Sequence, residues 1–345
     1  MKRWAAAARK VGWSFFTILF VIVLNFFLFR VLPGDPARAG VRDPRLTQEA
    51  QAAIRVRFGL DKPILNCFTS LNPLRFDAAA CAANPLETQF FVYIGNLLRG
   101  ELGISFHTNR PVADVLRERL GNTLLLIGAG QVLAIVIGVA IGVVAAWRSR
   151  TALDYAALVA SLVAWSLPTF WLGLLLLFWG SRDFGLPIGG QATIGATYAN
   201  AWERWLDVGR HMLLPTLTQT IIYVAEYVLI MRSTMLTVLS EDYILTAKAK
   251  GLNTFQILKD HALRNAALPI ITVIALNLGF TVAGAIQIES VFSWPGLGQA
   301  TYEAVVRRDY PLLQGAFLLL AVSVIIANLA ADLLYTYLDP RVQTA

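Results

Sequence analysis

Residues 121–147 read GNTLLLIGAGQVLAIVIGVAIGVVAAW, a run without one charged side chain. An α-helix rises about 1.5 Å per residue, so about 20 mainly apolar residues cross the roughly 30 Å hydrocarbon core of a membrane. Core helices of soluble proteins have no need of such an unbroken apolar length. The run therefore predicts a membrane-spanning helix from Gly121 to Trp147.

Five further segments have the same character. They are Val11–Phe29, Tyr155–Gly180, Met212–Met231, Leu268–Ile288 and Leu312–Leu338. Of the 345 residues, 57% are hydrophobic and only 15% are charged, whereas soluble domains carry about 25% charged residues. We therefore predict an all-α membrane protein with six transmembrane helices.

The first segment has an alternative interpretation as a secretory signal, because Lys and Arg precede it and Ala37-Arg38-Ala39 resembles a cleavage site. The apolar core of a signal peptide, however, is only about 7–15 residues long. The segment Val11–Phe29 is longer, and the small residues lie several polar positions beyond it. We interpret it as an uncleaved transmembrane helix.

The distribution of Lys and Arg predicts the orientation, because short cytoplasmic loops carry the excess of these residues. With the N-terminus inside, the inner loops and tails carry twelve and the short outer loops carry five. Both termini are then cytoplasmic. Residues 1–10 form an N-terminal tail, residues 31–118 a small extracytoplasmic subdomain, and residues 119–345 a core of five helices.

The two cysteines, Cys67 and Cys81, both fall in the predicted extracytoplasmic subdomain. A disulfide persists in an oxidising compartment, so we expect the two to be paired, with two unrelated free thiols as the alternative. The three histidines are far apart and give no metal-ligand spacing. We expect no metal site.

Few acids lie within the predicted spans. Glu226 and Asp332 are expected to lie at the membrane interface or to pair helices, rather than to form a proton relay. The amides of the spans could bond between helices or line a polar pathway, and we favour the first role; they are Asn25, Gln131, Asn277, Gln314 and Asn328.

Small residues and prolines predict local features of the helices. Gly138 and Gly142 form a small-xxx-small motif, which lets another helix approach closely. Pro168 and Pro215 remove backbone hydrogen bonds, so we expect kinks there, acting either as hinges or as static bends.

Several chemistries are excluded by the absence of their motifs. The chain has no GxxxxGK[ST] loop, no GxGxxG, no HExxH and no GxSxG. We therefore predict that it has no ATPase site or other enzymatic activity and binds no cofactor of its own. Its basic residues are scattered between apolar runs, which does not indicate a nucleic-acid partner.

The most informative loop lies between the fourth and fifth spans. Ser240 is expected to cap a short helix that ends at Gly251, and a second helix is expected from Asn253 to about Asn265, with Gln256 completing a capping box. Pro269 is expected to open the next span. We interpret residues 240–266 as a helical hairpin that docks in a groove on a partner. A solvated loop and a DNA-binding helix-turn-helix are the alternatives, and tethering at both ends opposes the second.

Two runs of this loop resemble the EAA loop of ABC-importer permeases, with Leu245-Thr246-Ala247 in place of Glu-Ala-Ala. They are AKAKGL at 247–252 and HALRNAALP at 261–269. Four other runs resemble the B-type permease subunit of dipeptide and oligopeptide importers: LPGDPA at 32–37, GELGISF at 100–106, SVFSWPGLG at 290–298 and RDYP at 308–311. One departure is an apparent insertion between Leu65 and Phe90.

This resemblance implies a type I ABC-importer permease fold in the bacterial inner membrane. It implies a homologous second permease, two ATPase subunits or one ATPase heterodimer that bind ATP and Mg²⁺, and an extracytoplasmic peptide-binding protein, with lipid around the spans. The hairpin would couple the chain to the ATPases through Glu241, Asp242, Tyr243, Leu245, Ala247, Lys248, Lys250, Gly251, Leu252 and Phe255.

The cargo expected from the resemblance is a di- or oligopeptide, and nickel or another small solute is the alternative within the same branch. A gradient-driven secondary transporter is a more distant alternative. It predicts buried ionisable residues and internal repeats, and neither is evident in the sequence. A membrane-embedded hydrolase has no nucleophile motif to support it.

Overall fold

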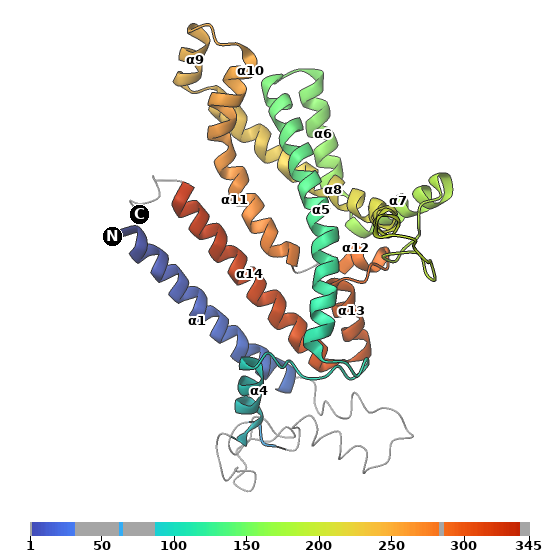
Figure 1. Ribbon diagram of the computed structural model, residues 1–345. Helices are drawn as coiled ribbons and strands as arrows, with labels where there is room; N and C mark the ends of the chain where they lie inside the picture. Colours follow the sequence, from blue (N-terminus) through green and yellow to red (C-terminus); the bar gives the residue numbers. More distant parts are fainter. Residues whose placement is uncertain (1, 32–61, 65–86, 283–285, 339–345) are drawn as a thin grey trace. The chain divides into compact units, whose positions relative to one another are not determined.

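The computed structural model describes residues 2–31, 62–64, 87–282 and 286–338. Their regular structure is helical, with one isolated bridge between Ile104 and Pro111. The helices are α1 (Lys2–Val31), α4 (Gln89–Leu98), α5 (Val112–Trp147), α6 (Ala152–Ser166), α7 (Thr169–Phe184), α8 (Ala201–Leu239), α9 (Asp242–Ala249), α10 (Thr254–Gln256), α11 (Leu263–Val282), α12 (Ile286–Val291), α13 (Leu297–Arg307) and α14 (Tyr310–Leu338) (Figure 1).

The chain divides into two compact units. The first contains Met1–Val11, Gly121–Gln299 and Ile326–Ala345, and the second contains Gly12–Leu120 and Ala300–Ile325. The long helices α1, α5 and α14 contribute residues to both units. Cys67, Cys81 and most of the predicted insertion lie outside the residues that the structure describes.

Four described helices are long and apolar enough to cross a membrane, which confirms a membrane protein built mainly of helices. They contain the segments Ala7–Phe29, Val112–Trp147, Ala201–Leu239 and Tyr310–Leu333. The predicted first, second, fourth and sixth spans each fall on one of them. The helices extend beyond the predicted boundaries. Their ends carry exposed charged residues such as Arg117 and Glu118, which the apolar runs do not include.

The third predicted span is not one continuous helix. It breaks into α6 and α7, which are bent by 101°. Leu167 has an extended conformation (φ −78°, ψ 129°) and so has Pro168 (φ −60°, ψ 129°). A proline lacks the N–H for the helix and disfavours helical geometry in the residue before it. The kink expected at Pro168 is confirmed, whereas α8 continues through Pro215.

The fifth predicted span, Leu268–Ile288, is wrong in its boundaries. The helix α11 begins earlier, at Leu263, and includes Pro269, while Ile286 and Ile288 belong to the separate short helix α12. The α11 helix is not among the helices that meet the length and apolarity needed for a membrane span.

The glycines of α5 allow α8 to pack closely against it, as the small-xxx-small motif predicts. A Cβ atom at Gly138 would lie 2.6 Å from the Cβ of Tyr227, and one at Gly142 would lie 2.7 Å from the Cβ of Met231. Such separations are sterically forbidden, so a side chain at either position would have to push α8 away. The motif is confirmed as a helix contact.

Polar side chains connect α5, α8 and α11. Gln131 donates to the hydroxyl of Tyr227, and the Asn277 amide donates to the same hydroxyl and to Glu226, both at 3.1 Å. These bonds confirm interhelical roles for Gln131 and Asn277. Asp332 on α14 pairs with Lys10 on α1 at 3.2 Å, so it too connects two helices, as expected.

A buried glutamate fixes the segment that follows α12. Glu289 is 0% exposed and accepts hydrogen bonds from the Thr123 hydroxyl at 2.8 Å and from the Gln299 backbone N–H at 2.9 Å. The Thr123 hydroxyl oxygen accepts the Leu297 N–H at 2.7 Å. A Cβ atom at Gly298 would lie 3.0 Å from the Glu289 carboxylate, so this glycine makes room for the acid.

Within the second unit, the run RDYP at 308–311 holds the loop that follows α4. Asp309 is 1% exposed and accepts from the Ser105 hydroxyl at 2.5 Å and from the backbone N–H groups of Phe106 and His107 at 3.1 and 3.2 Å. The runs GELGISF and RDYP, which are about 200 residues apart in the chain, therefore meet in one contact.

Candidate functional site

The hairpin predicted at residues 240–266 is present at one end of α8 and α11 (Figure 1). Its first helix, α9, begins after Glu241, whose side chain makes no capping hydrogen bond. Ser240 ends α8 instead, and its hydroxyl donates to the carbonyl of Thr237 at 2.7 Å. The prediction that Ser240 caps the hairpin helix is wrong, because the hydroxyl turns back toward the preceding helix.

The turn of the hairpin has the hydrogen bonds of a Schellman motif. The N–H of Gly251 donates to the carbonyl of Lys248 at 3.0 Å, and the N–H of Leu252 donates to that of Ala247 at 3.3 Å. Gly251 has φ +79°, a left-handed conformation that glycine adopts without strain. The predicted glycine stop is confirmed.

The second helix of the hairpin begins with the predicted capping box. The Asn253 side chain accepts from the Gln256 N–H at 2.9 Å, and the Gln256 side chain accepts from the Asn253 N–H at 3.0 Å. The helix does not end near Asn265, however. A π-helical segment, Ile257–Ala262, connects it directly to α11. The hairpin and α11 therefore share one continuous helical backbone.

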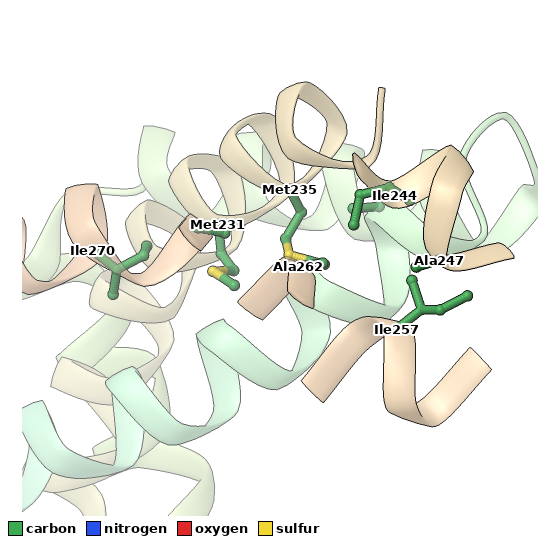
Figure 2. Close-up of a cluster of buried hydrophobic side chains, with 9 residues drawn as sticks. Met231, Met235, Ile244, Ala247, Ile257, Ala262 and Ile270 are labelled. Atoms are coloured by element: carbon green, nitrogen blue, oxygen red, sulfur yellow. The ribbon is translucent and has the colours of Figure 1, made fainter. Parts of the chain in front are cut away.

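One face of the hairpin is buried in an apolar cluster shared with the long helices (Figure 2). Ile244 and Ala247 of α9 and Ile257 of the π-helical segment contact the ends of α8 and α11. The cluster consists of Ala146, Met231, Met235, Ile244, Ala247, Ile257, Ala262, Ala266 and Ile270. Each fully buried side chain of the size of Ile or Met contributes about 1.5–3 kcal/mol. The cluster therefore fixes the hairpin to α8 and α11.

The other face of the hairpin is open and partly apolar. Tyr243, Leu245 and Phe255 are 39%, 68% and 69% exposed. Around them the charged predicted residues Glu241, Asp242, Lys248 and Lys250 are exposed as well. Large apolar side chains on a surface whose opposite side is fixed are typical of an interface with a partner helix or groove.

Two of the predicted docking residues lie elsewhere. Ala247 is 5% exposed and belongs to the apolar cluster, and Leu252 is half-buried against the same cluster. Helical periodicity explains the difference, since Ile244 and Ala247 are three positions apart and share one face. Sequence reasoning missed Ile244 and Ile257 as the buried side of the hairpin; the spacing to Ala247 relates only to Ile244, and Ile257 lies on a separate helical segment.

Nearly the whole chain matches two family models. Residues 138–344 match the family model "Binding-protein-dependent transport system inner membrane component", and residues 5–127 match its N-terminal model. The chain belongs to this family. The hairpin is therefore part of an inner membrane transport component.

Named relatives agree with the family. A protein of Brucella suis biovar 1 (strain 1330) named as a peptide permease is 37% identical over 329 residues, covering 94% of this chain and 95% of the relative. The dipeptide transport system permease protein DppB of Escherichia coli K12 is 34% identical, covering 97% of each chain. The di/tripeptide permease DppB of Pseudomonas aeruginosa is 34% identical, covering 97% and 98%.

In this binding-protein-dependent permease, an ion pair joins α6 to α8 beside Met231, which belongs to the apolar cluster of the hairpin. Arg232 on α8 donates to both carboxylate oxygens of Asp154 on α6, at 2.5 and 2.8 Å, and the Arg150 N–H donates to the same carboxylate at 2.9 Å. The Asp154 side chain is 1% exposed. A bidentate pair of this kind restrains geometry strongly, so it holds α6 and α8 together.

Two further contacts define the exposed face. The Asn265 amide donates to the Tyr243 hydroxyl at 2.9 Å, which joins the two halves of the hairpin. The Lys259 ammonium lies 5.9 Å from the centre of the Phe255 ring, within the range of a cation–π contact. Among the described residues, no group of His, Cys, Asp and Glu could hold a metal ion.

Proposed function

We propose that the chain is one of two permease subunits of an ATP-driven importer of di- or oligopeptides and forms half of its translocation pathway. The support comes from relatives named as peptide, dipeptide and di/tripeptide permeases that match over nearly the whole chain. A glutathione permease, GsiC of Escherichia coli O6:H1, is also 34% identical and covers 95% of the chain. Short peptides are the cargo that these names share.

The proposed architecture is a type I importer permease with six membrane spans. Both termini are cytoplasmic, residues 31–118 form an extracytoplasmic subdomain, and residues 119–345 form the five-helix core of a multi-pass protein in the bacterial inner membrane. The broken pair α6 and α7 supplies the third span, because α6 with its 15 residues is only about 22 Å long. The fifth span is supplied by α11.

The hairpin couples the chain to a separate ATPase. The observation that carries this role is its two-sided structure, in which one face is fixed to α8 and α11 and the other exposes Tyr243, Leu245 and Phe255. Closure of two partner ATPase subunits on ATP and Mg²⁺ moves the docking groove, and the fixed face transmits that movement to the long helices. A second permease and an extracytoplasmic binding protein complete the assembly.

Purification with the neighbouring subunits tests this function. We expect the complete complex with its binding protein to hydrolyse ATP faster when di- or tripeptides are present, because cargo delivery promotes closure of the ATPases. The steady-state rate of ATP hydrolysis is measured with and without each candidate cargo. Stimulation by nickel and not by peptides would correct the cargo, whereas stimulation by neither would contradict the assignment.

We also propose that Cys67 and Cys81 form a disulfide that closes the extracytoplasmic insertion. A closed loop of about 15 residues contributes about 3 kcal/mol in the chain-entropy model. Thiol labelling of the unfolded protein is expected to modify neither cysteine without reductant and both after reduction. Labelling of both in the nonreduced protein would show that the bridge is absent.

A further inference from the structure

Glu226 is a charged side chain placed among apolar helices. It lies on α8 within the predicted span Met212–Met231. The described core lengths of the neighbouring helices contain no Asp, Glu, Lys or Arg: 121–147 of α5, 155–166 of α6, 169–180 of α7 and 265–282 of α11. Arg232 is about 9 Å further along the axis of α8 and pairs with Asp154.

The carboxylate of Glu226 is held in position by a hydrogen bond. Asn277 donates to it at 3.1 Å and donates at the same distance to the hydroxyl of Tyr227. The Asn277 amide is uncharged, and the described residues include no cation paired with Glu226. Glu289 differs, because it is 0% exposed and fully occupied by the segment after α12.

Part of the Glu226 side chain remains accessible in the isolated chain, where it is neither buried nor fully exposed. A carboxylate facing lipid costs several kcal/mol, and charged residues in spans therefore face a water-filled cavity or another charge. In a chain that forms half of a pathway, the accessible side of Glu226 then faces that pathway. An acid in this place attracts cations.

We propose that Glu226 lines the translocation pathway and binds the cationic group of the cargo during its passage. This inference rests on the proposed import of peptides. The group bound is the ammonium or guanidinium of a basic side chain. Asn277 positions the carboxylate and is itself held by the Tyr227 hydroxyl, and the water of the pathway keeps the ion pair weak enough for the cargo to leave.

The test uses the complete importer in proteoliposomes, with its binding protein and ATP, and three cargoes: alanyl-lysine, alanyl-alanine and alanyl-glutamate. Loss of one charge-assisted hydrogen bond in Glu226→Gln is expected to slow the import of alanyl-lysine about tenfold relative to wild type. Alanyl-alanine should slow less and alanyl-glutamate least. Glu226→Lys should steepen this order, because it repels cations. The initial rate for each peptide is compared with the wild-type rate for the same peptide.

Two control variants complete the experiment. Glu226→Asp keeps the charge and should retain the wild-type preference. Asp332→Asn removes an acid that pairs with Lys10 and should leave all three rates unchanged.

An equal fall for the three peptides in Glu226→Gln would overturn the inference and give Glu226 a structural role. Failure of Glu226→Gln to assemble with its partners, while Glu226→Asp assembles, would overturn it in the same way. Uptake of none of the peptides by the wild-type importer would instead overturn the proposed function, and this inference with it.

Discussion

Gly251→Val is expected to separate the permease from its ATPases. Gly251 has φ +79° in the Schellman turn, where an ordinary side chain costs about 1–2 kcal/mol and a β-branched one is a genuine outlier. The turn connects the two short helices that carry the exposed side chains of Leu245 and Phe255. We expect the variant to lose most of its bound ATPase on purification and to lose peptide uptake, as measured by subunit stoichiometry and transport rate.

A matched control shows whether the loss of ATPase comes from backbone strain in general or from strain in the hairpin turn. Gly185 also has a positive φ, +61°, at the end of α7, and a Cβ atom at either glycine meets nothing within 4 Å. Gly185→Val should therefore carry a similar strain and keep its ATPases. Gly251→Asn should restore binding, because asparagine tolerates the left-handed region. Normal assembly and uptake by Gly251→Val would contradict the coupling role of the hairpin.

Local sequence signals predicted the parts of the structure that depend on neighbouring residues. The apolar run after Gly121 predicted the long helix α5, and Asn253 with Gln256 predicted the capping box. Gly251 predicted the turn, and Gly138 with Gly142 predicted the close approach of α8. Each of these signals consists of residues within a few turns of one another, although the helix that packs on Gly138 and Gly142 is distant in the chain.

Features that depend on distant residues escaped the sequence. Pro168 predicted a bend but not a break of 101°. The angle also depends on the packing of α7 against α8 and α12, which residues near Pro168 do not reveal. Glu289 gave no signal of its bonds to Thr123 and Gln299, which join residues far apart in the chain. The sequence predicts Ala247 on the docking face, whereas the structure buries it in the cluster that contains Met235 and Ile257. Neither of these neighbours lies on the helix of Ala247.

The exposed face of the hairpin has a function only when a partner protein binds to it, and a partner is also needed to supply energy. The chain has no phosphate-binding loop of its own. Within the described helices the acids of the spans are few, and Asp332 is already paired with Lys10. Coupling to an ion gradient would need a series of ionisable groups along the pathway, and Glu226 by itself does not form one, so energy is expected to come from the separate ATPases.

Reconstitution tests this central claim most directly. Proteoliposomes that contain only this chain should neither hydrolyse ATP nor take up peptide under a proton or sodium gradient. Proteoliposomes that also contain the second permease, both ATPases and the binding protein should accumulate radiolabelled dipeptide when ATP is supplied. Gradient-driven uptake by the chain alone would contradict the account and identify a secondary transporter.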